Sequence, residues 1–184
     1  LTSIFFTFFF YISVLIFITG VSYKIVQYWQ TPAPLKIPIA PAPLNRSGVL
    51  LRIAREVFLF QSLFKASKWT WIFGWSFHLA LVLLFFRHLV YFWPGEIPTI
   101  LLKTEPLKYA AYPLIFGLLG LLGRRLFVDR VRYISAPSDY LMLLLLIVIG
   151  GSGMLMTFAQ NHPNMLLVKN FAEGLITFKW SELP

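Results

Sequence analysis

Four long apolar runs dominate the pattern of this chain. They occupy about residues 1–28, 69–93, 107–127 and 138–159. Each run reaches or approaches the roughly 20 apolar residues that a helix needs to cross a bilayer. The third run is the shortest. The pattern predicts an all-α integral membrane helix bundle that forms one domain over residues 1–184.

The segment 29–68, between the first two runs, has a mixed pattern. Thr31–Leu44 contains five prolines in 14 residues, which excludes regular helix and favours an extended path. In Val49–Phe64, apolar residues recur at helical spacing, and Arg52 and Arg55 stand among the polar positions between them. This predicts an amphipathic helix, which either lies on the inner membrane surface or docks a partner. The sequence leaves both possibilities open.

Three shorter features follow the third run. Ser138 and Asp139 come just after Pro137 and are candidate caps for the fourth helix. Gly150–Gly153 consists of small residues, which allow either a close helix approach or room for a planar ligand, and close packing is favoured. Met165–Phe178 is predicted to form a short interfacial helix.

Composition supports the membrane prediction and excludes some chemistry. Hydrophobic residues make up 58% of the chain and charged residues 12%, with a mean hydropathy of +0.74. These values lie far from those of soluble domains. The chain has no cysteine, so disulfides, thiolate catalysis and iron–sulfur ligation by this chain are excluded.

The distribution of basic residues predicts an orientation. The net charge is +9, and 11 of the 16 basic residues lie in two connections on the same side of the predicted bundle. These are Lys24, Lys36, Arg46, Arg52, Arg55, Lys65 and Lys68, and then Arg124, Arg125, Arg130 and Arg132. The positive-inside rule places both connections in the cytoplasm and the N-terminus outside. We therefore expect a multi-pass membrane protein, in contact with lipid and not with nucleic acid.

Two histidines stand within the second apolar run. His78 and His88 are ten residues apart, which corresponds to about 15 Å along a helix and a net rotation of about 280°. This separation is too large for one mononuclear metal ion. A proton relay would need carboxylates, and the apolar parts of the four runs contain none. Two stacked b-type hemes, each bound by one of these histidines, fit the spacing better.

Arg87 is adjacent to His88 in the same apolar run. Arg87 could pair with a heme propionate near the outer surface. The alternative for His78 and His88 is a structural role, in which both imidazoles hydrogen-bond to neighbouring helices. His162 lies beside Pro163 in a turn-like junction, where a solvated surface histidine is the better interpretation.

Several stretches resemble a known family. The two histidines ten apart resemble the heme-ligand pattern of the gamma subunit of respiratory nitrate reductase. The chain is more closely similar to the membrane cytochrome b subunit (the M subunit) of the redox complex associated with dissimilatory sulfite reductase. The stretches behind this are TPAPLKIP (31–38), KWTWIFGWSFHLAL (68–81), RHLVYF (87–92) and DRVRYISAPSDYLML (129–143).

The resemblance implies a function. It implies a five-helix bundle with two b hemes, in which His78 ligates the heme nearer the cytoplasm and His88 the heme nearer the outer face. Such a subunit exchanges electrons with a membrane quinone and with a cytoplasmic iron–sulfur subunit related to heterodisulfide reductases. The resemblance also implies a location in the bacterial inner membrane, with other membrane and periplasmic subunits in the same complex of dissimilatory sulfur metabolism. We expect the long basic segment 29–68 to dock the iron–sulfur subunit.

The second axial ligands are expected to come from outside residues 1–184, since the four predicted helices offer only His78 and His88. We expect a fifth apolar segment of about 20 residues that carries two histidines. The alternative function is a heme-free structural anchor for a redox complex. A small transporter or channel subunit is the third possibility, and it has the least support because few polar groups could line a path.

Overall fold

The computed structural model describes residues 2–32, 45–93, 105–158 and 165–178, and every element in these ranges is helical. The elements are α1 (Thr2–Gln30), α2 (Arg46–Leu59), α3 (Gln61–Ala66), α4 (Lys68–Phe92), the 3-10 helix η1 (Glu105–Ala110), α6 (Ala111–Phe127), α7 (Asp129–Tyr133), α8 (Pro137–Phe158) and α9 (Met165–Thr177). His162 and most of the proline-rich segment lie outside the described residues.

Four stretches are long and apolar enough to cross a membrane. They are Ile4–Gln30, Lys68–Phe92, Pro106–Phe127 and Pro137–Phe158. The predicted all-α membrane bundle with four spanning helices is therefore confirmed. Most large apolar side chains on these helices are exposed, as expected where lipid or further helices cover a surface in place of water.

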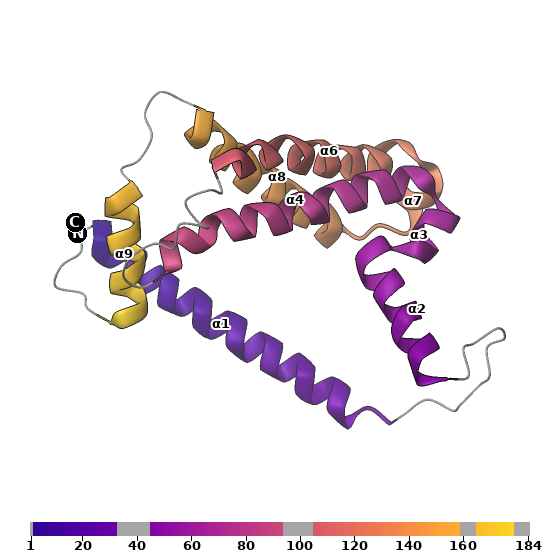
Figure 1. The fold of residues 1–184 in the computed structure, drawn as a ribbon, viewed down its shortest axis with the longest axis horizontal. Helices are drawn as coiled ribbons and strands as arrows, with labels where there is room; N and C mark the ends of the chain where they lie inside the picture. The colour runs from indigo at the N-terminus through magenta and orange to yellow at the C-terminus, as the bar shows by residue number, and fades with distance from the viewer. Residues whose placement is uncertain (1, 33–44, 94–104, 159–164, 179–184) are drawn as a thin grey trace.

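The centre of the bundle is a layer of three helices, in which α6 packs between α4 and α8 (Figure 1). Its buried side chains come from each of these helices and include Ala80, Leu114, Leu118 and Leu143. Ala80 and Leu118 are each only 1% exposed. We call α4, α6 and α8 the three-helix core.

Glycines on α6 set the distance between α4 and α6. A Cβ atom added at Gly117 would lie 2.6 Å from the Phe73 carbonyl oxygen, and one at Gly120 would lie 2.2 Å from the Phe73 ring. On α8, a Cβ at Gly150 would lie 2.8 Å from Leu114, whereas Gly153 has nothing within 4 Å. Small residues at helix contacts of membrane proteins permit such close approach. The packing interpretation of the glycine-rich stretch is thus confirmed at Gly150.

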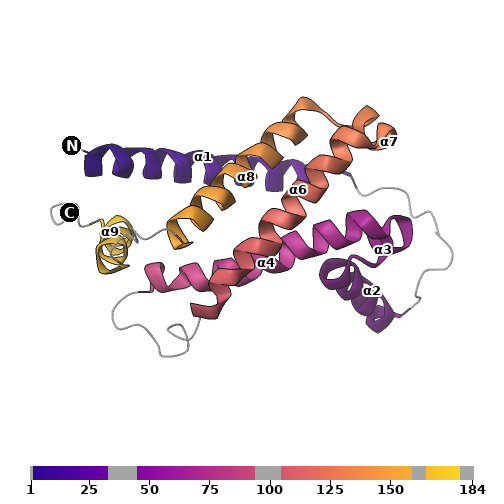
Figure 2. The ribbon, with the colours of Figure 1, turned by 90° about the horizontal axis from the view of Figure 1, so that it is seen from above.

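Helix α1 runs apart from the three-helix core along most of its length (Figure 1), although it overlaps α8 when the molecule is seen from above (Figure 2). Near its N-terminal end it meets the region of α9. There the Tyr11 hydroxyl donates a hydrogen bond of 2.6 Å to the Leu175 carbonyl, and the Tyr11 and Phe178 rings stack with centroids 5.5 Å apart. The predicted helix Met165–Phe178 is observed as α9, ending at Thr177.

The basic connections gather at one end of the molecule. The C-terminal end of α1, the α2–α3 pair and α7 all lie at this end (Figure 1). Its described basic residues are Lys24, Arg46, Arg52, Arg55, Lys65, Lys68, Arg124, Arg125, Arg130 and Arg132. We call this the basic end.

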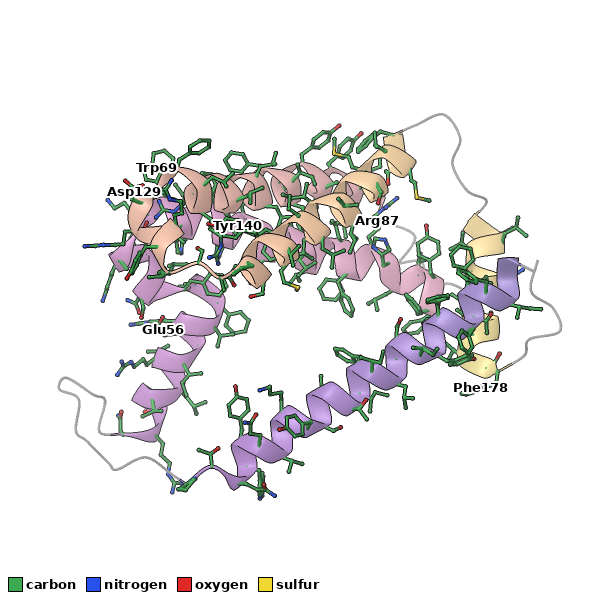
Figure 3. All side chains as sticks on the ribbon, turned by 180° about the vertical axis from the view of Figure 1, so that it is seen from behind. Glu56, Trp69, Arg87, Asp129, Tyr140 and Phe178 are labelled. Atoms are coloured by element: carbon green, nitrogen blue, oxygen red, sulfur yellow. The ribbon has the colours of Figure 1, made fainter. Side chains whose placement is uncertain are left out.

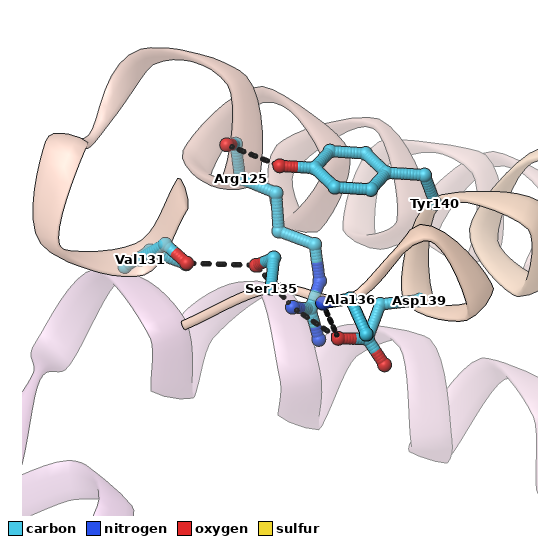
Figure 4. A network of polar contacts seen from close by, with 6 residues as sticks. All are labelled: Arg125, Val131, Ser135, Ala136, Asp139 and Tyr140. Carbon is cyan, nitrogen blue, oxygen red and sulfur yellow. Dashed lines mark hydrogen bonds and ion pairs between the residues drawn. The ribbon is translucent and has the colours of Figure 1, made fainter. Parts of the chain in front are cut away.

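A polar network joins α6 to α8 at the basic end (Figure 4). The Arg125 guanidinium donates to Ser135 Oγ at 2.7 Å and to Asp139 Oδ2 at 3.2 Å, and the Tyr140 hydroxyl donates to the Arg125 carbonyl. Asp139 Oδ2 also accepts the Ala136 backbone N–H at 3.0 Å. The predicted cap is therefore confirmed for Asp139, which reaches back from within the first turn of α8 in the manner of the third helical residue of a capping box.

The single amphipathic helix predicted over Val49–Phe64 is wrong. The structure divides this stretch into α2 and α3, because Phe60 between them adopts a left-handed conformation with φ of 48°. A non-glycine residue in this region carries strain that the surroundings must offset. We call residues 46–66 the elbow.

Candidate functional site

Hydrogen bonds from both flanks hold the elbow in its bent form. The Glu56 carboxylate accepts the Ser62 backbone N–H at 3.0 Å and the Ser62 hydroxyl at 2.6 Å, and so caps the start of α3. The Phe60 N–H donates to the Glu56 carbonyl at 3.2 Å. One side chain thus joins the end of α2 to the beginning of α3.

Two tryptophans of α4 fix the elbow to the spanning helix. The Trp71 indole N–H donates to the Leu59 carbonyl at 2.7 Å, and the Trp75 indole N–H donates to the Phe58 carbonyl at 3.2 Å. Both acceptors are in the last turn of α2, whose carbonyls have no partner within the helix. The two donors are four residues apart and therefore project from one face of α4.

The elbow brings Phe60 onto His78. The Phe60 ring lies edge-on to the imidazole with centroids 5.0 Å apart, and the Phe77 ring lies 4.8 Å from the same imidazole. His78 is thus flanked by apolar rings from two elements. The strained residue of the elbow is in direct contact with one of the two histidines that the sequence selected.

Both candidate histidines make the same hydrogen bond. Nδ1 of His78 lies 2.7 Å from the Gly74 carbonyl oxygen, and Nδ1 of His88 lies 2.7 Å from the Leu84 carbonyl oxygen. A carbonyl can only accept, so Nδ1 carries the proton in each ring. The lone pair of the neutral imidazole is then on Nε2. This tautomer, held by a backbone carbonyl, is the form in which histidine binds a metal.

The two imidazoles leave surface exposed on α4, outside the tight contact with α6. That contact involves Phe73 and Phe77, which approach Gly117. Arg87 adjoins His88 in the chain on the C-terminal third of α4 (Figure 3). Among the described residues, no group of three or more His, Asp or Glu gathers as in a mononuclear metal site. The two imidazoles of α4 would supply one nitrogen ligand to each of two hemes.

Acid is expected to loosen the elbow. The two hydrogen bonds from Ser62, led by that from its hydroxyl, lower the pKa of Glu56 below its ordinary value. A lowered pKa in the folded state means that the stabilisation is fully present above the usual range of a glutamate and is lost as the pH falls through the folded value. We expect hydrogen-exchange protection of the Ser62 amide to fall across this acidic range.

The matched variant for this measurement is Glu56→Gln, which keeps the shape of the side chain but does not titrate. Its Ser62 amide should be less protected than that of the unmodified chain at neutral pH, and its protection should not change across the same pH range. A pH dependence equal to that of the unmodified chain would show that another group controls the elbow.

Comparison with known proteins adds a second line of evidence. The chain is similar to two curated archaeal proteins. Each is named Hdr-like menaquinol oxidoreductase cytochrome b-like subunit. The relative from Archaeoglobus profundus is 29% identical over 92% of this chain, and that from Archaeoglobus fulgidus is 30% identical over 91%. The chain spans 62% of the length of each relative.

The other comparisons found no match. No family model matches the chain, and no solved structure does. The resemblance to the gamma subunit of nitrate reductase and the link to dissimilatory sulfur metabolism therefore remain predictions. The bacterial membrane also remains a prediction, and both relatives are archaeal.

Sequence reasoning selected His78, His88 and Arg87 but missed Phe60. A phenylalanine gives no local signal for a left-handed conformation, which glycine and asparagine usually adopt. The only sequence feature that pointed to a contact here was the pair Trp71 and Trp75. Their indole N–H groups need acceptors, and the structure supplies these from the end of α2.

Proposed function

We propose that this chain is the b-type cytochrome subunit of a membrane quinol oxidoreductase. In this role it transfers electrons between a quinol of the menaquinol class and a soluble iron–sulfur subunit. The observation that carries the proposal is the pair of Nδ1–carbonyl hydrogen bonds, which presents Nε2 of both His78 and His88 for ligation. The names of the two relatives support the quinol and the cytochrome.

His78 and His88 would each hold one heme b, and Arg87 would offset the charge of a propionate. Heme iron supplies one-electron chemistry at each level, since it cycles between the ferrous and ferric states. The role of this chain is to bind and orient. The carbonyls of Gly74 and Leu84 fix the two rings, and the Phe60 and Phe77 rings pack edge-on against the His78 imidazole.

We further propose that the basic end lies in the cytoplasm, with the N-terminus outside. The positive-inside rule supports this orientation, since the described basic residues of both connections lie at that end. A soluble iron–sulfur subunit related to heterodisulfide reductases would dock there. Arg124, Arg130 and Arg132 give this end a positive field that attracts an acidic partner surface. In this proposal, a fifth helix with two histidines would supply the remaining ligands.

An optical spectrum of the purified protein tests the proposal. The protein with its full complement of helices, reduced with dithionite, should show the sharp alpha band of b heme, and menaquinol should reduce the same band. Heme-free protein that still co-purifies with its redox partner would support the alternative, a structural anchor. That alternative draws on one observation: no described residue offers a second imidazole opposite His78 or His88.

A further inference from the structure

The elbow packs beside the first part of α4, where Trp71, Trp75 and His78 contact it. Helix α4 is long and apolar enough to cross a membrane and begins at Lys68, two residues after the end of α3 at Ala66, so the elbow lies towards one end of a candidate span. Helix α2 runs crosswise to α4 at this end of it (Figure 1). A helix that lies crosswise to a spanning helix at its end is roughly parallel to the bilayer plane.

The two faces of α2 differ in polarity. Leu50, Ile53 and Val57 recur at helical spacing on one face and are 69%, 54% and 59% exposed. Arg52, Arg55 and Glu56 lie on the other arc of the helix. Figure 3 shows Glu56 on the side of α2 turned away from the length of the spanning helices. The apolar face is therefore turned towards the hydrocarbon layer that α4 crosses.

We propose that the elbow is a membrane-surface anchor for a bilayer that contains anionic phospholipids. In this arrangement, α2 lies in the boundary of the bilayer with Leu50, Ile53 and Val57 among the acyl chains. Arg52 and Arg55 bind lipid phosphates on the polar side. The inference is independent of heme binding and concerns which surface the elbow occupies.

Two observations favour a lipid surface over a protein partner. First, the elbow continues directly into a spanning helix, so lipid must be present at its level whether or not a partner is bound. Second, arginines beside exposed leucine, isoleucine and valine are typical of helices that lie in an anionic interface. Guanidinium groups bind phosphate oxygens in a bidentate manner, which an arginine pair on one arc can repeat at two headgroups.

Residues 1–184 contain no cysteine, so a cysteine introduced there is a unique label site within this range. Spin labels at Leu50→Cys and Val57→Cys report on the apolar face, and a label at Arg55→Cys reports on the polar face. Val82→Cys, half-exposed within α4, is the lipid standard, and Tyr133→Cys, 90% exposed on α7, is the water standard. The labelled full-length protein is placed in vesicles of phosphatidylcholine with or without phosphatidylglycerol, with no partner present.

Collision rates with oxygen and with a water-soluble nickel chelate then give the depth of each label. We expect Leu50→Cys and Val57→Cys to resemble Val82→Cys in anionic vesicles, and Arg55→Cys to resemble Tyr133→Cys. In protein labelled at Val57→Cys, Arg52→Gln and Arg55→Gln should each lower the ratio of lipid-shielded to water-exposed α2 by about fivefold. This shift should be absent in pure phosphatidylcholine.

Two results would overturn the inference. If the Val57 label is as accessible to the nickel chelate as the Tyr133 label, and is shielded only when the soluble iron–sulfur subunit is added, the face is a protein-docking surface. If shielding depends on neither lipid charge nor either arginine, Arg52 and Arg55 do not bind lipid phosphates and the assigned surface is wrong.

Discussion

Replacement of His78 by alanine is expected to remove one b heme and to leave the other, and His88→Ala should remove the second heme instead. The two histidines lie about 15 Å apart along α4, so the loss of one proposed ligand should leave the other site intact. Each variant should retain about half of the heme per protein and lose a different component of the alpha band. The measurement is the pyridine hemochrome content together with a low-temperature reduced spectrum.

Two controls make this result specific. Leu79→Ala shortens an exposed side chain next to His78 and should keep the full heme content. Added imidazole should restore part of the lost band in His78→Ala, because it supplies the missing nitrogen ligand. If both histidine variants keep the complete spectrum, the proposed heme ligands are wrong. If either variant loses all heme, the two sites are not independent.

Gly117→Ala is expected to destabilise the bundle by about 1–3 kcal/mol, which is the usual cost of overpacking a well-packed contact. The added Cβ atom would lie 2.6 Å from the Phe73 carbonyl oxygen and 2.9 Å from the Phe77 backbone nitrogen. Both neighbours belong to the backbone of α4, so the whole helix must move to relieve the contact. The midpoint of unfolding in a denaturing detergent series measures the change.

The matched control is Gly153→Ala on α8. Nothing lies within 4 Å of an added Cβ there, and alanine is favoured over glycine in a helix by up to about 1 kcal/mol. This variant should be as stable as the unmodified chain or slightly more stable. Equal destabilisation by both substitutions would show that α4 and α6 do not pack through Gly117 as described.

The class of the fold and the candidate spanning helices follow from the sequence. A run of about 20 apolar residues can satisfy its backbone in lipid only as a helix, so the four runs fixed the class of the fold without any tertiary information. The positions of the polar exceptions, His78 and His88, were equally visible, because an imidazole within an apolar run is costly unless it has a use. The all-α membrane bundle was confirmed, whereas the roles of the two histidines remain predictions.

The sequence could not show the elbow. Val49–Phe64 has continuous helical periodicity, and Phe60 favours a right-handed conformation. The bend depends on contacts with distant residues, since the indoles of Trp71 and Trp75 bind carbonyls 12 and 17 residues away. These long-range bonds, with the Glu56 cap, offset the local strain at Phe60.

Several other properties were also decided by the tertiary structure. Glycines recur through α6 and α8, and only the packing distinguishes Gly117 and Gly150, which have close neighbours, from Gly153, which has none. The tautomer of His78 likewise required the position of the Gly74 carbonyl. The sequence by itself determined which segments enter the membrane, because transfer into lipid depends on composition. The tertiary structure decided which faces meet, because contact depends on shape.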